Sequence, residues 1–208
     1  MSAQKHLIAD VPTPAAQVST AINGTDFGQI ANLHDAYPEI FAGKSALGPI
    51  LNKAAIRAPA DTIKFLLELG LDPNVGHAPF GENALAVAAR KGRLEIVKIL
   101  RKAGAKLDTS EPTRNPLVAV ASSNSVDVAQ YLLDEGIDAT ISYSGQNYQG
   151  MTAASLALES GAIDVARTIV LHIARGDRAR AQDLLLEAYE TVNRNNPDAR
   201  SYPPPPTL

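Results

Sequence analysis

Residues able to bind a metal or transfer a proton are few in this sequence and widely separated. The histidines stand far apart and have no partner at ligand spacing; they are His6, His34, His77 and His172. The absence of cysteine excludes disulfides, thiolate nucleophiles and cysteine-bound zinc. Neither a Gly-x-Ser-x-Gly motif nor a phosphate-binding Gly-x-x-x-x-Gly-Lys loop occurs. The sequence therefore predicts a protein without catalytic, cofactor-binding or metal-binding residues, not an enzyme.

Four acidic residues recur at one position of a repeated pattern. Asp61, Glu95, Asp127 and Asp164 each come directly before an apolar stretch with helical spacing. An acid in the first turn of a helix stabilises the helix dipole. We therefore interpret these carboxylates as helix-start residues and not as a catalytic pair, and the elements that position them as short helices.

The composition favours a helical protein. Of the 208 residues, 45% are hydrophobic and only 5% are aromatic, which suits closely packed short helices better than a sheet. The net charge is −3, so the chain has no basic excess to neutralise phosphates and nucleic-acid binding is not expected. Neither an N-terminal signal peptide nor an apolar run of transmembrane length is evident, and we expect an intracellular, soluble protein, cytoplasmic or nuclear, without a membrane partner.

An internal repeat organises the chain. Three segments, residues 61–70, 95–104 and 127–136, each run from an acidic residue to a glycine, and residues 164–172 form a fourth copy. A second apolar segment precedes each copy in the same register, at residues 49–55, 83–89, 115–121 and 152–158. Four aligned helix–turn–helix units predict an all-α solenoid.

This pattern resembles the ankyrin repeat, whose units of roughly 33 residues carry a Thr-Pro-Leu-His signature. Residues 81–108 match best, although no copy keeps the whole tetrapeptide: Asn83 and Asn115 replace the threonine and no histidine follows. Asparagine also caps helices, so that exchange is mild. Asn124 replaces the glycine between the two helices of the third repeat, and Ala58-Pro59 fills the same turn in the first.

The repeats define the expected domain organisation. We expect an ankyrin-repeat domain at residues 21–194, with repeats at about 48–75, 81–108, 114–140 and 150–175. Helices at residues 26–36 and 177–192 are expected to cap its ends, because solenoid ends need polar outer faces. We expect residues 1–20 to be flexible and the Pro-rich residues 195–208 to form a disordered tail.

The resemblance implies a protein–protein interaction module, an adaptor or scaffold, that binds its partner through hairpin fingers and the concave helix surface. Candidate finger residues are Phe80, Glu82, Gln149 and Met151. Candidate residues at the ends of the first helices are Arg90, Lys91, Ser122, Ser123, Glu159 and Ser160. Solvation alone is the alternative role for each.

The finger at residues 140–150 is longer than the others and carries Tyr143 and Tyr148 among Ser, Gln and Asn. Tyrosines in such a loop give a large contact area for a partner. Packing of the tyrosines on the neighbouring hairpin is the alternative. A groove beside this finger would suit the second candidate function, a small-molecule-binding protein or an enzyme.

Two further motifs are candidates. The Leu-rich segment ending in Asp72-Pro-Asn74 looks like the pattern at which ankyrin asparagines can be hydroxylated, although Asn74 can equally serve the turn's own hydrogen bonds. The tail could be a ligand for a proline-recognition domain of the SH3 or EVH1 type, through Arg200, Tyr202, Pro203 and Pro206.

Overall fold

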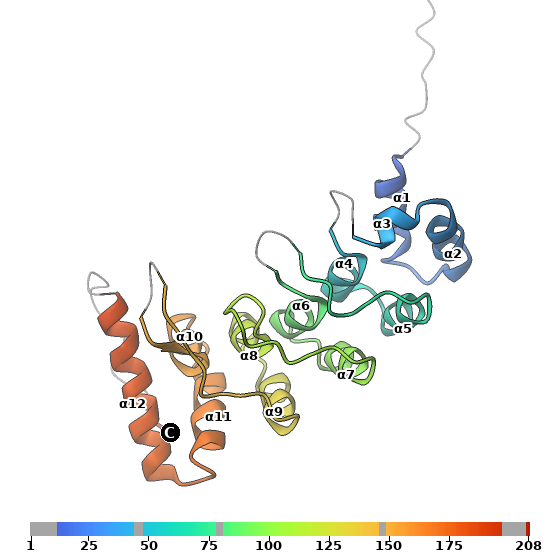
Figure 1. The fold of residues 1–208 in the computed structure, drawn as a ribbon. Coiled ribbons are helices and arrows are strands. Elements are labelled where there is room, and N and C mark those ends of the chain that lie inside the picture. Colours follow the sequence, from blue (N-terminus) through green and yellow to red (C-terminus); the bar gives the residue numbers. More distant parts are fainter. Residues whose placement is uncertain (1–11, 44–47, 78–80, 146–148, 197–206) are drawn as a thin grey trace, which may run out of the picture.

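The structure, a computed structural model, describes residues 12–43, 48–77, 81–145, 149–196 and 207–208. Its helices lie in two parallel rows (Figure 1). The inner row contains α1 (Pro14–Ala21), α4 (Ile50–Arg57), α6 (Ala84–Arg90), α8 (Pro116–Ala119) with its 3-10 extension η1 (Val120–Ser122), and α10 (Ala153–Glu159). The outer row contains α2 (Phe27–Ala36), α5 (Ala60–Glu68), α7 (Leu94–Lys102), α9 (Val126–Asp134) and α11 (Ile163–Ile173).

Two more helices complete the solenoid. The short α3 (Pro38–Phe41) follows α2, and α12 (Arg178–Asn195) packs against α10 and α11 at the far end (Figure 1). In the described residues the only strands are β1 (Ser142–Tyr143) and β2 (Met151–Thr152), which pair antiparallel with Tyr143 opposite Met151. The predicted all-α repeat solenoid with capping helices is confirmed.

The inner helices other than α4 begin at side-chain caps. Asn83 Oδ1 accepts a hydrogen bond from the Ala86 N–H, and Thr152 and Ser155 form a reciprocal capping box at the start of α10. Between the helices of the third repeat, Asn124 adopts a φ of 48°, where Gly92 of the second repeat has 66°. Asparagine tolerates this left-handed conformation better than most residues, so the helix pair is kept without glycine.

The first repeat ends its inner helix in a different way. Ala58 is extended and Pro59 has no N–H, so the last carbonyls of α4 depend on another donor. Arg93, from the second repeat, supplies it: its guanidinium donates to the carbonyls of Ala54, Ala55 and Ala58. Burial lowers the pKa of Arg93 below its ordinary value. The end of α4 is thus completed by the next repeat.

A continuous core lies between the rows and extends into both caps. Leu85 in α6 and Leu117 in α8 are fully buried. Ala84, Ala86, Ala88 and Ala89 are also fully buried in α6, and their small side chains let α6 pack closely between α4 and α8. The caps join the same core: the Phe27 and Phe65 rings lie 4.9 Å apart, and Thr62 Oγ1 donates to the Gly24 carbonyl of the N-terminal cap over 2.6 Å.

The ends of the chain differ from the expected boundaries. The predicted flexible segment, residues 1–20, overlaps α1, which starts at Pro14 because Thr13 caps it and Val18 is fully buried. At the other end, α12 continues to Asn195, inside the predicted tail. The carbonyl of Thr207 accepts a hydrogen bond from Arg167 Nε, and the Leu208 N–H donates to Gln182 Oε1. The last two residues therefore contact α11 and α12.

Candidate functional site

A groove of about 350 Å³ runs along the exposed side of the inner row, from α6 across α8 to α10. Its floor is apolar and consists of Val118, Ala119 and Leu156, all half-buried. The remaining lining residues are polar or come from the loop before α8: Glu82, Arg90, Pro112, Thr113, Ser122 and Ser160. The repeat stack thus forms an elongated surface with an apolar floor and a polar rim.

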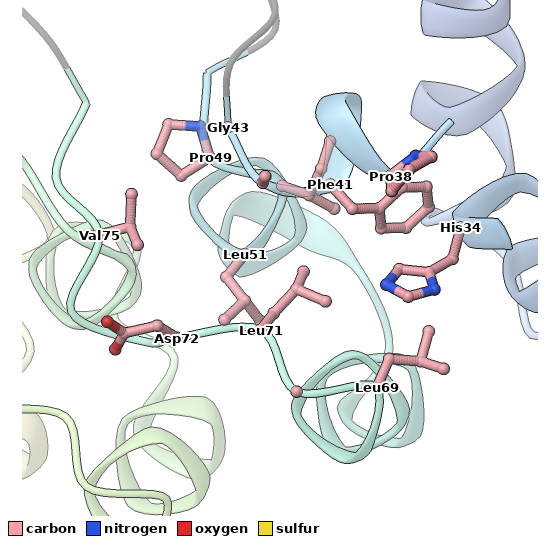
Figure 2. A pocket seen from close by; sticks show the side chains of 13 residues that line it. His34, Pro38, Phe41, Gly43, Pro49, Leu51, Leu69, Leu71, Asp72 and Val75 are labelled. Atoms are coloured by element: carbon pink, nitrogen blue, oxygen red, sulfur yellow. The ribbon is translucent and has the colours of Figure 1, made fainter. Parts of the chain in front are cut away.

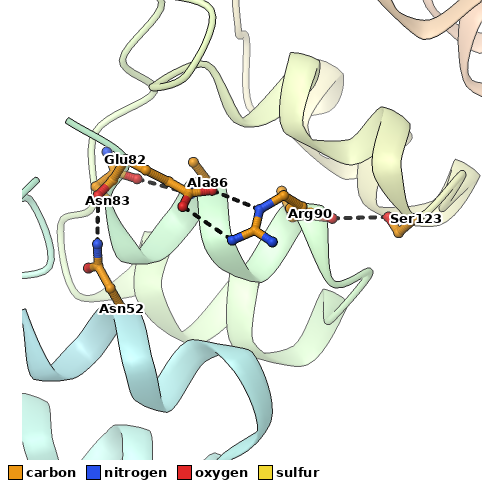
Figure 3. A network of polar contacts seen from close by, with 7 residues as sticks. Asn52, Glu82, Asn83, Ala86, Arg90 and Ser123 are labelled. Atoms are coloured by element: carbon orange, nitrogen blue, oxygen red, sulfur yellow. Dashed lines mark hydrogen bonds and ion pairs between the residues drawn. The ribbon is translucent and has the colours of Figure 1, made fainter. Parts of the chain in front are cut away.

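One rim of the groove is an ion pair that spans the length of α6 (Figure 3). Arg90 Nε donates to Glu82 Oε1 over 2.8 Å, and a second nitrogen donates to Oε2 over 3.2 Å. The Glu82 carbonyl in turn accepts a hydrogen bond from Asn52 Nδ2 of the first repeat. Because a bidentate pair has a defined geometry, Glu82 and Arg90 form a preorganised wall.

The structure brings four of the predicted partner-binding residues together in this groove. Glu82, Arg90, Ser122 and Ser160 all line it. Lys91 is exposed at the end of α6. The groove residues come together because equivalent residues of successive inner helices lie side by side.

The remaining helix-end and finger residues that the structure describes have contacts within the fold. The hydroxyl of the half-buried Ser123 donates to the Ala89 carbonyl over 3.1 Å and so adds a contact at the end of α6 (Figure 3). The exposed Glu159 accepts a hydrogen bond from Asn196 Nδ2, and the backbone of Gln149 is bonded to the Asn195 side chain. The side chain of Gln149 itself is exposed.

Two predicted contact residues are buried instead. Tyr143 is only 7% exposed and Met151, its partner across the β1–β2 hairpin, is 1% exposed. Asn115 Nδ2 donates to the Tyr143 hydroxyl over 2.8 Å, and that hydroxyl donates to the Thr109 carbonyl over 3.0 Å. Burial also raises the pKa of Tyr143. This tyrosine packs on the neighbouring hairpin and orients Asn115, the cap of α8, so the expectation of a partner-contacting side chain is corrected.

We expect Tyr143→Phe to lower the free energy of unfolding by about 1–2 kcal/mol, because Asn115 and the Thr109 carbonyl each lose a buried partner. Urea denaturation followed by circular dichroism would measure this. Tyr37→Phe is the control, since its hydroxyl has no hydrogen bond to the part of the chain that the structure describes. Equal stability of the two variants would show that the hydroxyl network contributes nothing.

Six of the predicted residues lie outside the described residues. They are Phe80, Tyr148, Arg200, Tyr202, Pro203 and Pro206. The proposals for the proline-recognition motif and for the tip of the long finger therefore remain predictions from the sequence.

Asn74 uses its side-chain amide between two repeats. Its Nδ2 donates to the Gly104 carbonyl over 3.2 Å, and its Oδ1 accepts from the Lys106 N–H over 2.8 Å. Asp72 Oδ1 accepts from the Asn74 N–H. The amide thus links the loop after α5 to the loop after α7, which is the turn role considered from the sequence. Modification of Asn74 stays a prediction.

Two other cavities lie at the ends of the stack. One, of about 300 Å³, lies between the N-terminal cap and the first repeat, where Phe41, Leu51 and Leu71 form apolar walls beside His34 and Asp72 (Figure 2). The other, of about 210 Å³, lies beside the long finger, where the second candidate function would need a groove. It is smaller than the about 300–1,000 Å³ of typical ligand pockets.

Sequence reasoning missed the apolar floor of the groove and the cavity in Figure 2. The signal for the floor is present in the repeat alignment: Ala119 and Leu156 hold equivalent positions on the exposed side of successive inner helices. The cavity beside Phe41 has no such signal, because it arises where the cap meets the first repeat and belongs to no repeated motif. Within the described ranges, no cluster of three or more His, Asp or Glu side chains could hold a metal ion.

Comparison with known proteins agrees with the fold. The chain matches the ankyrin repeats family, described as three copies, over residues 42–111 and 107–183. The chain belongs to the ankyrin-repeat family. It is also 26% identical over 148 residues to a transient receptor potential cation channel subfamily A member 1 homolog of Caenorhabditis elegans. That match covers 71% of this chain and 12% of the relative. None of the helices among the described residues is long and apolar enough to span a bilayer.

Proposed function

We propose that this chain is an adaptor or scaffold that binds a partner protein along the concave surface of its inner row. Ankyrin repeats are protein–protein interaction modules in general. The observation that supports the proposal here is the groove with the Val118, Ala119 and Leu156 floor and a rim that includes Ser122 and Ser160. An apolar centre surrounded by polar groups is the usual anatomy of a protein interface.

The contacts along the rim support a protein partner. The Glu82–Arg90 pair is held in place before any partner binds, so that wall is ordered in the free chain. Ser122 and Ser160 are exposed, and their hydroxyls can donate to or accept from a partner backbone. A preorganised wall and free hydroxyl groups suit an extended or helical segment of another protein that crosses several repeats.

Filling the groove tests this proposal. We expect Ser122→Phe with Ser160→Phe to reduce the amount of partner captured by the intact chain at least about tenfold, because two large side chains occupy the space above the floor. Affinity capture followed by quantitative mass spectrometry would measure it. Gln130→Phe with Asn32→Phe is the control, because it also places two phenylalanines at exposed sites, but on outer helices. Equal loss in both variants, or in neither, would exclude the groove as the binding surface.

A further inference from the structure

One corner of the inner row carries cations that the fold does not neutralise. The exposed Ile56 and Arg57 lie one turn after the half-buried Lys53 on α4, and Lys91 occupies the position of Arg57 in the next repeat. None of the three cations forms an ion pair with any residue that the structure describes. Ile56, beside Arg57 on this helix, is an apolar side chain that is 42% exposed. We call these four residues the basic corner.

Neighbouring arginines do not share this property. Arg90, beside the basic corner, is neutralised by Glu82. Arg93 directs its guanidinium to the carbonyls at the end of α4. The free positive charge of the inner row is therefore concentrated at Lys53, Arg57 and Lys91, although the chain as a whole has a net charge of −3.

The opposite end of the same surface has the opposite sign. Glu159 in α10 occupies the position that Ile56 holds in α4 and Arg90 in α6, and it is exposed. The exposed side of the inner row therefore changes from basic at α4 and α6, through the serines of η1, to acidic at α10. A partner segment with separated charges would bind in one direction, because like charges that meet across an interface cost several kcal/mol.

We propose that the basic corner binds an acidic segment of the partner protein, with an apolar side chain of that segment covering Ile56. This inference rests on the proposed function. Packed helices lie about 8–10 Å apart, so carboxylates a few residues apart in an extended segment can reach α4 and α6 together. The exposed isoleucine favours a peptide over nucleic acid, because a phosphate backbone offers it no apolar contact.

An array of synthetic peptides of about twelve residues tests the proposal, since an extended peptide of that length spans about four repeats. Three sets share the same apolar residues and differ in charge: acidic, neutral and basic. A single-stranded oligonucleotide serves as the fourth probe. We expect the full chain at about 0.15 M salt to bind the acidic set at least about tenfold more tightly than the other probes.

Matched variants locate the site. Lys53→Glu with Arg57→Glu and Lys91→Glu should reverse the preference, and the Gln versions should weaken acidic binding at least about tenfold. The control is Lys102→Glu with Lys106→Glu and Arg178→Glu, which changes the net charge equally at exposed sites elsewhere. Glu82→Gln should strengthen acidic binding about two- to threefold, because it releases the charge of Arg90.

The outcomes separate this inference from the proposed function. If the acidic and neutral sets bound equally, and the variant with Ser122→Phe and Ser160→Phe lost this binding, the groove would remain the proposed binding surface. The role of the basic corner would be overturned. Tighter binding of the oligonucleotide, or an equal effect of the control variant, would overturn it too. Absence of binding by every peptide set also contradicts it. Thermal unfolding of each variant checks that the protein is folded under the conditions of the binding measurement.

Discussion

Replacing Leu85 with alanine should lower the free energy of unfolding by about 2–5 kcal/mol. Leu85 is fully buried in α6, and α6 packs against α4 on one side and α8 on the other. Truncation removes apolar contacts with both neighbouring repeats and leaves a cavity that the alanine-rich helix cannot close. Leu117→Ala in α8 should cost a similar amount, because Leu117 holds the same position and is equally buried.

Chemical denaturation followed by far-ultraviolet circular dichroism measures both effects, which suits a chain without tryptophan. Leu186→Ala is the matched control, since this leucine is 41% exposed on α12 and its truncation should change stability by no more than about 0.5 kcal/mol. A loss well below 1 kcal/mol at Leu85 would mean that the inner helices present a different face to the core.

The second large effect is expected at Arg93. Arg93→Met keeps most of the aliphatic length but removes the donors to the α4 carbonyls, and it should lower the free energy of unfolding by about 2–3 kcal/mol. The value lies below the sum for three fully buried acceptors, because the Ala54 carbonyl keeps its hydrogen bond from the Ala58 N–H. Arg93 is also only half-buried, so water can reach part of the site. Equilibrium denaturation measures it.

Lys102→Met is the control for the loss of a charge from the same helix, since Lys102 is exposed and should change stability only slightly. Hydrogen exchange adds a local test. The Arg93→Met substitution should increase the exchange rates of amides in the last turn of α4, relative to the native protein. The rates of amides in α9 should increase less. Uniformly faster exchange along the chain would argue against a specific role at the end of α4.

The repeat architecture could be predicted from the sequence because its signals are local and recur. The acids at Asp61, Glu95 and Asp127 each lie in the first turn of an outer helix, as expected. The role of Arg93 could not be predicted in the same way. Its partners are carbonyls some 35–39 positions earlier in the chain, and an exposed-looking arginine beside a turn carries no signal of such a contact.

The binding surface was predictable only in part, for a related reason. Ser122 and Ser160 were candidates because of the repeat register, and both line the groove. Composition alone made Tyr143 look like a contact residue, because a tyrosine among Ser, Gln and Asn is typical of exposed binding loops. Pairing of β1 with β2 turns its ring toward the preceding repeat, where Asn115 needs an acceptor for its amide. The contact between Tyr143 and Asn115 therefore becomes evident only when the pairing of β1 with β2 is known.

The contact between Arg93 and α4 also bears on the order in which the chain becomes stable during synthesis. When the ribosome has released only the first repeat, the carbonyls of Ala55 and Ala58 still lack their donor. One repeat later the contact is weaker: Ser123 adds a donor to the Ala89 carbonyl, which already accepts a hydrogen bond from the Gly92 N–H. The first repeat should therefore reach its native stability only after the second repeat has emerged from the ribosome.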